Sequence, residues 1–331
     1  MKKIISLLTL LLITIFTLTA CGATSLSFSG SFWNKNQTNA SEPVYEECVY
    51  KISVVDKTPS NSTQMQNQNV KLVVNAGEYK TTLEFKNNAS TYGEHYVYTT
   101  TLTLNGEYQI KGKEPKPFSD VVTTTTVFKN ILSSFAPIYS QKTASCSTYY
   151  NNVTNDVVSI AYDYKLSYGD KDATLTYKTA SYQQLDTAEE KSTTFKNYKG
   201  DGAFVDNNLL LLLPRAYDYK NAISDSFNLI DSVSISLKKL RYASSTNSEG
   251  NLDIKTLPGG YSIDGGEQIA LPESIKIYAY VDETFSGQSL ESYYATEHST
   301  HRHRMTKSYT LLNDQIGYLE YSLSSVKTTK N

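Results

Sequence analysis

Apolar and polar residues alternate along most of this chain of 331 residues. A period of two is typical of strands that bury one face of a sheet. It predicts strands at residues 49–55, 69–74, 79–85, 92–110, 121–128, 157–166, 173–182, 232–242, 274–282, 289–295, 305–312 and 317–326. About a dozen strands, with turn signals between them and few helices, indicate a mainly β, antiparallel architecture.

Two turn signals predict hairpins. Asn105–Gly106 is a strong hairpin dipeptide, and a three-residue loop of Leu104, Asn105 and Gly106 would place Leu102 opposite Tyr108. Residues 168–171 would join the strands at 157–166 and 173–182 into a second hairpin.

Two short segments favour helical turns. Residues 207–213 follow Asp206, a good N-cap, and precede Pro214, so we expect one or two helical turns there. The five consecutive leucines at 209–213 are equally compatible with a buried strand. Residues 130–135 favour a short helix before Pro137.

The first 21 residues have the order of an export signal. Lys2 and Lys3 precede an apolar stretch at 4–18, which is short for a spanning helix. The segment Leu18-Thr19-Ala20-Cys21 resembles the lipobox of bacterial lipoproteins, and the alternative is an ordinary signal peptide with an incidental cysteine.

The lipobox resemblance implies three parts and a location. Residues 1–20 would be a signal peptide, and residues 21–43 an acylated cysteine with a flexible tether. Residues 44–331 would form a β-rich extracytoplasmic domain, as one body or as two packed halves that divide near 140–155. A diacylglyceryl group on Cys21 would hold the protein to the outer face of the cell membrane.

Composition excludes some partners. The chain has 31 basic and 33 acidic residues, a balance that argues against a nucleic-acid surface. Arginine occurs only four times, which is few for a dedicated anion-recognition protein, whereas the 27 tyrosines suit pleated, half-buried surfaces. Outside the cytoplasm, Cys48 and Cys146 could form a disulfide, and the alternative is two separate buried thiols.

The histidines are the main candidate for chemistry. His298, His301 and His303 lie in one run with Glu297, and His301 and His303 would share a face of a strand. Imidazoles suit Zn²⁺, Cu²⁺ or Ni²⁺, but the spacing matches no standard zinc motif and a fourth ligand is not evident. A solvated polar loop is the alternative. Nucleophile-elbow, P-loop and dinucleotide motifs are absent, so we expect a protein without enzymatic activity or cofactor.

Several short segments in the last 120 residues resemble a group of uncharacterised bacterial secreted and lipoprotein domains. They are residues 206–215, 285–288, 293–295 and 316–321, with Pro214 as a departure from the pattern. The resemblance implies a fold similar to the half-barrel of lipoprotein carriers, an incomplete barrel curled around one or two short helices. We therefore expect either a half-barrel or a curved sandwich.

Two kinds of ligand follow as hypotheses. A half-barrel would bind an apolar or lipidic ligand, or a cell-envelope partner, on its concave face. The alternative is a carbohydrate- or cell-wall-binding module that uses surface tyrosines. The candidate tyrosines are Tyr149 with Tyr150, Tyr217 with Tyr219, Tyr278 with Tyr280, and Tyr293 with Tyr294. A metal-dependent hydrolase at the histidine run is a third hypothesis.

Overall fold

The computed structural model describes residues 43–60, 69–88, 91–131, 134–197, 204–217, 219–281, 290–297, 301–313 and 316–330. The expected signal segment, Cys21, nearly all of the tether and His298 lie outside these residues. Within the described part, hydrogen bonds join eighteen strands into one sheet, and the helical elements are three short 3-10 turns besides a single helical residue, His301. The expectation of a mainly β, antiparallel fold with short helices is confirmed.

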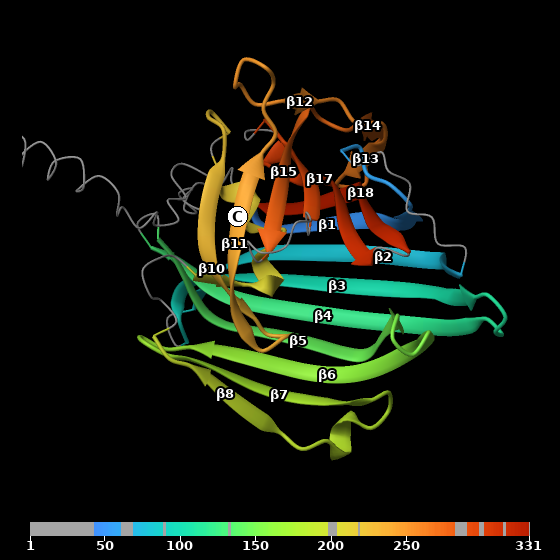
Figure 1. The fold of residues 1–331 in the computed structure, drawn as a ribbon. Coiled ribbons are helices and arrows are strands. Elements are labelled where there is room, and N and C mark those ends of the chain that lie inside the picture. Colours follow the sequence, from blue (N-terminus) through green and yellow to red (C-terminus); the bar gives the residue numbers. More distant parts are fainter. Residues whose placement is uncertain are drawn as a thin grey trace, which may run out of the picture.

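The first half of the chain is an antiparallel meander of long, curved strands (Figure 1). Each strand pairs with the next in the order β1 (Pro43–Val55), β2 (Val70–Asn88), β3 (Gly93–Ile110), β4 (Lys116–Ile131), β5 (Ser134–Asn151), β6 (Asp156–Tyr168), β7 (Ala173–Ser181) and β8 (Lys191–Phe195). The hairpin of β6 and β7 confirms the turn expected at residues 168–171. Hydrogen bonding also continues from β4 through β5 to β6, across residues 140–155, the region where the sequence predicts the division if the domain has two packed halves.

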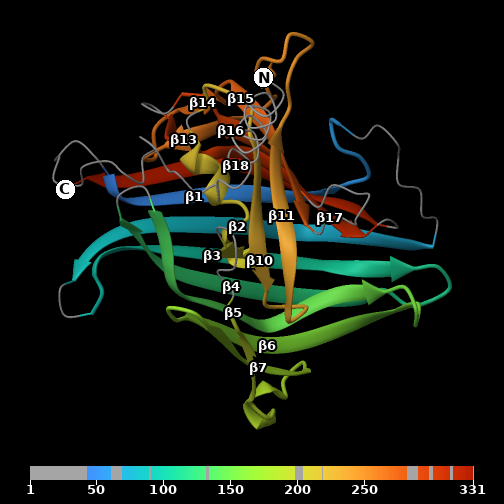
Figure 2. The ribbon, with the colours of Figure 1, turned by 60° about the vertical axis from the view of Figure 1, so that its left-hand side comes forward.

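The second half returns to the first strand. It contains β9 (Phe204–Asp206), β10 (Ser224–Asp231), β11 (Ser236–Ser244), β12 (Ile254–Lys255), β13 (Gly260–Ile263), β14 (Gln268–Ala270), β15 (Ser274–Val281), β16 (Leu290–Ala295), β17 (Met305–Asn313) and β18 (Gly317–Lys330). Strand β18 pairs antiparallel with β1, so Pro43 lies opposite Lys330 and Val55 opposite Tyr318. In Figure 2, β10 and β11 cross in front of the meander.

The helical turns are η2 (Leu185–Thr187), η3 (Asn207–Leu209) and η4 (Leu213–Ala216). None of the described helices is long and apolar enough to cross a bilayer. The side chain of Asp206 accepts a hydrogen bond from the backbone N–H of Asn208, which confirms the expected N-cap. Pro214 lies inside η4 rather than beyond the helical segment, because proline is tolerated in the first turn, where its missing N–H has no helical partner.

Leucines of this helical segment fill the space between the two halves of the sheet. Leu209, Leu212 and Leu213 are at most 1% exposed and belong to the main apolar core. Two buried tyrosines bond the segment's carbonyl groups: Tyr242 Oη donates to Leu210 O at 2.8 Å, and Tyr294 Oη to Leu211 O at 3.1 Å. Buried backbone oxygens need such donors. This arrangement accounts for part of the tyrosine content.

The hairpin expected at Asn105–Gly106 is wrong. Strand β3 is continuous through both residues, and Gly106 lies opposite Val74, where the register of β2 shifts by one residue. A Cβ atom at Gly106 would overlap the carbonyl oxygen of Val73. The glycine therefore permits a close backbone approach at a bulge rather than a turn.

The short helix expected at residues 130–135 is also wrong. Strand β4 continues to Ile131, strand β5 begins at Ser134, and these two residues face each other. The rings of Phe128 and Phe135 lie 4.9 Å apart between centroids. This aromatic contact forms across the two strands, and such cross-strand pairs stabilise a sheet.

Candidate functional site

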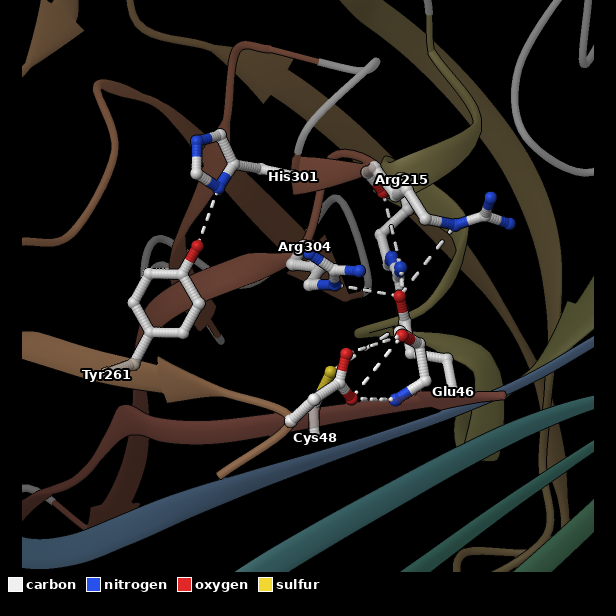
Figure 3. Close-up of polar contacts among 9 residues, drawn as sticks. Glu46, Cys48, Arg215, Tyr261, His301 and Arg304 are labelled. Atoms are coloured by element: carbon white, nitrogen blue, oxygen red, sulfur yellow. Dashed lines mark hydrogen bonds and ion pairs between the residues drawn. The ribbon is translucent and has the colours of Figure 1, made fainter. Parts of the chain in front are cut away.

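Three of the four arginines lie close to one buried carboxylate. Glu46, on β1, lies 2.6 Å from Nη2 of Arg215 in η4 and 2.8 Å from Nε of Arg304, just before β17. Arg302 Nε lies 3.8 Å from the same carboxylate. All four side chains are buried, and Figure 3 shows the carboxylate at the centre of the group. We call these four residues the Glu46 cluster.

The arginines of the cluster stabilise the ionised form of the Glu46 carboxylate. Burial alone would raise the pKa of Glu46, but the guanidinium groups of Arg215, Arg304 and Arg302 keep it well below its usual range. Cys48 lies beside the carboxylate, with Sγ 3.7 Å from Glu46 Oε1. Burial and the Glu46 charge raise the pKa of this thiol to about 12, so it keeps its proton at neutral pH. The cluster joins three distant segments and functions as a structural clamp.

Sequence reasoning missed this cluster. The low arginine content of the sequence does not indicate which arginines lie together in the fold. Arg302 and Arg304 lie close together in the sequence, but Glu46 and Arg215 reach them only through the pairing of β1 with β18 and the position of η4. A buried acidic residue on an otherwise apolar strand face, next to Cys48, is the one local signal.

His301 and His303 lie in a turn, not on a strand face. Arg302 and His303 have positive φ angles, which places them in the left-handed region immediately before β17. His301 Nδ1 is 2.6 Å from the hydroxyl of Tyr261, and its Nε2 is 3.7 Å from Glu297. The ring of His303 stacks on Tyr219, with centroids 4.1 Å apart.

The two described histidines of the run therefore have separate partners. His301 contacts Tyr261 and Glu297, whereas Nδ1 of His303 lies 3.3 Å from the carbonyl oxygen of Arg215. Burial lowers the pKa of His301. Among the residues that the structure describes, no three His, Cys, Asp or Glu side chains are grouped to hold a metal ion. His298 falls outside them.

Cys48 and Cys146 are both buried and are both free thiols in the structure. Of the two alternatives that the sequence left open, the structure thus has separate thiols. Cys146, on β5, has its Sγ 3.6 Å from Oγ1 of Thr148. Burial raises the pKa of the Cys146 thiol.

The candidate tyrosines differ strongly in exposure. Tyr293 and Tyr294 are at most 1% exposed, so these two belong to the interior of the protein. Tyr278 and Tyr280 are half-buried, with Lys276 Nζ 5.2 Å from the first ring centre and Arg241 Cζ 4.7 Å from the second. Tyr149 is 45% exposed and beside a hollow, which makes it the best placed to contact a ligand.

That hollow is an open groove of about 410 Å³ at one end of the long strands. Residues of β3, β5, the turn after β5, β17 and the segment before β18 line it: Tyr108, Thr148, Tyr149, Tyr150, Asn151, Asn152, Leu312 and Ile316. None of these eight side chains carries a charge. We call this feature the strand-end groove; its volume is within the range of small-molecule sites.

Hydrogen bonds fix the wall of the strand-end groove. The carboxylate of Asp120 accepts from the backbone N–H of Thr148 at 2.6 Å and from its hydroxyl at 2.7 Å. Tyr108 donates to the carbonyl oxygen of Thr148 at 3.3 Å, and Tyr150 donates to Asn155 Oδ1 at 2.6 Å. Burial and the charge of Asp120 raise the pKa of Tyr108, so this tyrosine is neutral.

The turn after β5 forms one lip of the groove. Asn151 Oδ1 accepts from the backbone N–H groups of Val153 and Thr154, at 2.9 and 3.3 Å. This side-chain turn presents Val153, which is 94% exposed, at its tip. Sequence reasoning found Tyr149 and Tyr150 but not Leu312 or Ile316, because the pairing of β18 with β1 brings those two to the groove.

Comparison with known proteins adds only a general likeness. No family model matches this chain, and no curated protein matches it. Among solved structures, the chain is similar to the crystal structure of a β-barrel-like protein of a domain of unknown function, DUF1849, from Brucella abortus. The likeness has a TM-score of 0.46 at 8% sequence identity and covers 87% of this chain and 99% of that chain.

Proposed function

We propose that this chain is a non-enzymatic binding protein that holds an uncharged, amphipathic ligand in the strand-end groove. The observation that carries the proposal is an open hollow of about 410 Å³ whose described lining residues include three tyrosines, a leucine and an isoleucine and no charged side chain. Apolar walls with a few fixed polar groups are typical of ligand sites.

The groove, rather than the centre of the fold, is the place for this ligand. A lipid carrier would need an empty concave face. Here Leu209, Leu212 and Leu213 occupy that region and are at most 1% exposed. Close-packed interiors of this kind leave little room for an acyl chain.

An acyl group on Cys21 would attach the protein to the outer face of the cell membrane, as the lipobox resemblance implies. Strand β1 begins at Pro43, nearest the tether, and ends at Val55, opposite Tyr318 and close to Ile316 of the groove. Its 13 residues span roughly 40 Å at about 3.3 Å each. The groove therefore lies near the end of β1 opposite to Pro43. In Figure 2, the C-terminus of β18 lies on the left and the end of β3 on the right.

Binding can be tested with octyl glucoside, an uncharged amphiphile, below its micelle concentration. The chain from residue 22 is suitable, because every contact described above lies within residues 43–330. Saturation-transfer NMR should show saturable binding, and Tyr149→Ala should weaken it at least five-fold. The matched control is Tyr182→Ala, since Tyr182 is 49% exposed but lies outside the groove. Lack of saturable binding, or equal weakening by both variants, would contradict the proposal.

The anchor has its own test. Cells that express the full chain are labelled with radioactive palmitate and then fractionated. We expect label in the wild-type protein, and neither label nor firm membrane retention in Cys21→Ala. Equal retention of both proteins in the membrane pellet would contradict the anchor and leave the groove hypothesis unaffected.

A further inference from the structure

We propose that the strand-end groove recognises an uncharged glycan that carries N-acetyl groups. This inference rests on the function proposed above and names the ligand class for the same groove. Three features of the lining carry it: an exposed aromatic ring, neutral amide groups, and a small apolar floor.

The exposed ring is that of Tyr149. It is 45% exposed, whereas the neighbouring Tyr150 is 8% exposed and is held by its hydrogen bond to Asn155. The C–H face of a pyranose is apolar and packs against an aromatic face, while the sugar hydroxyls remain in water or bond nearby polar groups. A rigid ring with a polar tip provides such a surface at low entropic cost.

The amides belong to Asn151 and Asn152, which both line the groove. The turn after β5 uses Oδ1 of Asn151, which orients this amide with its Nδ2 donor directed away from the two backbone N–H groups. An amide group offers both a donor and an acceptor without charge. It therefore matches sugar hydroxyls and the amide of an acetamido group.

The apolar surface of the groove comes from Ile316, at its floor, and from Leu312. Ile316 is 9% exposed and packs in a cluster with Tyr108 and Tyr150. Leu312 is 36% exposed at the mouth of the groove. An acetyl methyl group would bury its apolar surface here, which a plain hydroxyl could not do without losing its hydrogen bonds to water.

The surroundings disfavour an anionic sugar. The eight described lining residues include no cation to pair with a carboxylate or sulfate, and the Asp120 carboxylate is bonded to Thr148 of the lining. Its negative charge would repel an anion. The raised pKa of Tyr108 agrees with this local field.

The test uses the chain from residue 22 and three soluble probes: chitotetraose, cellotetraose and tetragalacturonate. Saturation-transfer NMR should show saturable binding of chitotetraose, binding of cellotetraose at least three-fold weaker, and no binding of tetragalacturonate. Tyr149→Ala and Leu312→Asp should each weaken chitotetraose binding at least five-fold, and Tyr182→Ala should leave it within two-fold. Circular dichroism and urea unfolding check that each variant is folded.

The outcomes separate the two proposals. If octyl glucoside binds in the groove but chitotetraose does not, the glycan assignment fails and the binding function stands. If neither binds, both fail. Equal affinity for cellotetraose would overturn the role of Ile316 and Leu312 as an acetyl site. Sedimentation with insoluble chitin then distinguishes a polymer ligand, which pulls the protein down, from free oligosaccharides, which do not.

Discussion

Glu46 and Arg215 are 169 residues apart in the sequence and meet through a buried ion pair of 2.6 Å. The contact joins the first strand of the meander to the helical segment that fills the core. Glu46 lies only three residues after the start of β1, so the clamp is also close to Pro43, the first residue of that strand.

Replacing Glu46 by Gln should destabilise the protein strongly. The variant would leave three guanidinium groups around a neutral amide in a buried site, and removing one partner of a buried ion pair costs about 3–5 kcal/mol. Urea unfolding at pH 7 measures the loss.

The matched control for this prediction is Glu47→Gln. Glu47 is next in sequence but is partly exposed, and its lysine partners Lys80 and Lys327 lie 3.9 and 3.7 Å away. Such pairs contribute about 1 kcal/mol or less. Equal losses in the two variants would show that the Glu46 cluster is not a clamp.

Both thiols should be inert in the folded chain. For Cys48, a pKa of about 12 leaves about one thiolate in ten thousand at pH 8. N-ethylmaleimide should add no mass to the native chain from residue 22 and two labels to the unfolded chain. A mass increase of about 2 Da on reduction, with no labelling of the unfolded oxidised chain, would instead show a disulfide.

Gly106→Ala should destabilise the meander by about 3 kcal/mol or more, since the new methyl group would overlap the backbone of Val73. Gly112→Ala is the control. Gly112 has a φ of +78° but no atom within 4 Å of a built Cβ, so only the left-handed conformation contributes, at about 1–2 kcal/mol. Urea unfolding compares them; a smaller loss at Gly106 than at Gly112 would contradict the close approach of Gly106 to the backbone of Val73.

Gly106 illustrates how far the sequence predicts the fold. Alternating polarity identified many of the strands and the hairpin of β6 and β7, because a half-buried face leaves its period in the sequence, but it missed β5 and β10 and divided β2 in two. Asn105–Gly106 has the composition of a turn, yet its environment is a bulge formed by β2. Local composition cannot distinguish a turn from a close approach by another strand. The pairing of strands in the folded protein decides which of the two forms.

The candidate site shows the same limit. Asp206 was found as an N-cap because its role is local, within two residues of Asn208. Tyr149 was found as an aromatic candidate, but the groove also needs Leu312 and Ile316, more than 160 positions later in the chain. Their place depends on β18 pairing with β1, which no local pattern specifies.

Asp206 should make the protein's stability depend on pH in an unusual direction. Burial raises its pKa, although Ser140, Tyr168 and the N–H of Asn208 all donate to the carboxylate. A raised pKa in the folded state favours folding at low pH, and this contribution is lost as the pH rises through the folded pKa. The stability of wild type relative to Asp206→Asn should therefore fall between pH 3 and pH 7.

Asp231→Asn is the opposite case and serves as the control for Asp206. Burial would raise the pKa of Asp231, but hydrogen bonds from Lys238 and Ser234 hold it below its usual value. Its contribution is present above the unfolded pKa and is lost as the pH falls. Relative to Asp231→Asn, wild type should gain stability between pH 3 and pH 7. Urea unfolding at pH 3, 5 and 7 tests both; parallel curves for the two variants would contradict the assignment.

His301 should lose its stabilising contribution on mild acidification. Burial lowers its pKa, the carboxylate of Glu297 partly opposes this effect, and Arg304 adds to it. The unfolded chain therefore takes up a proton near pH 6.5 more readily than the folded one, so folding is favoured above that pH and disfavoured as the pH falls below it. The NMR titration of the His301 ring should give a pKa below 6.5, and urea unfolding between pH 7.5 and pH 5.5 should show a smaller decline in His301→Gln than in wild type. A ring pKa at or above 6.5 would mean that the imidazolium is accommodated beside Tyr261 and Glu297, and the turn before β17 would then be more hydrated than its 13% exposed side chain indicates.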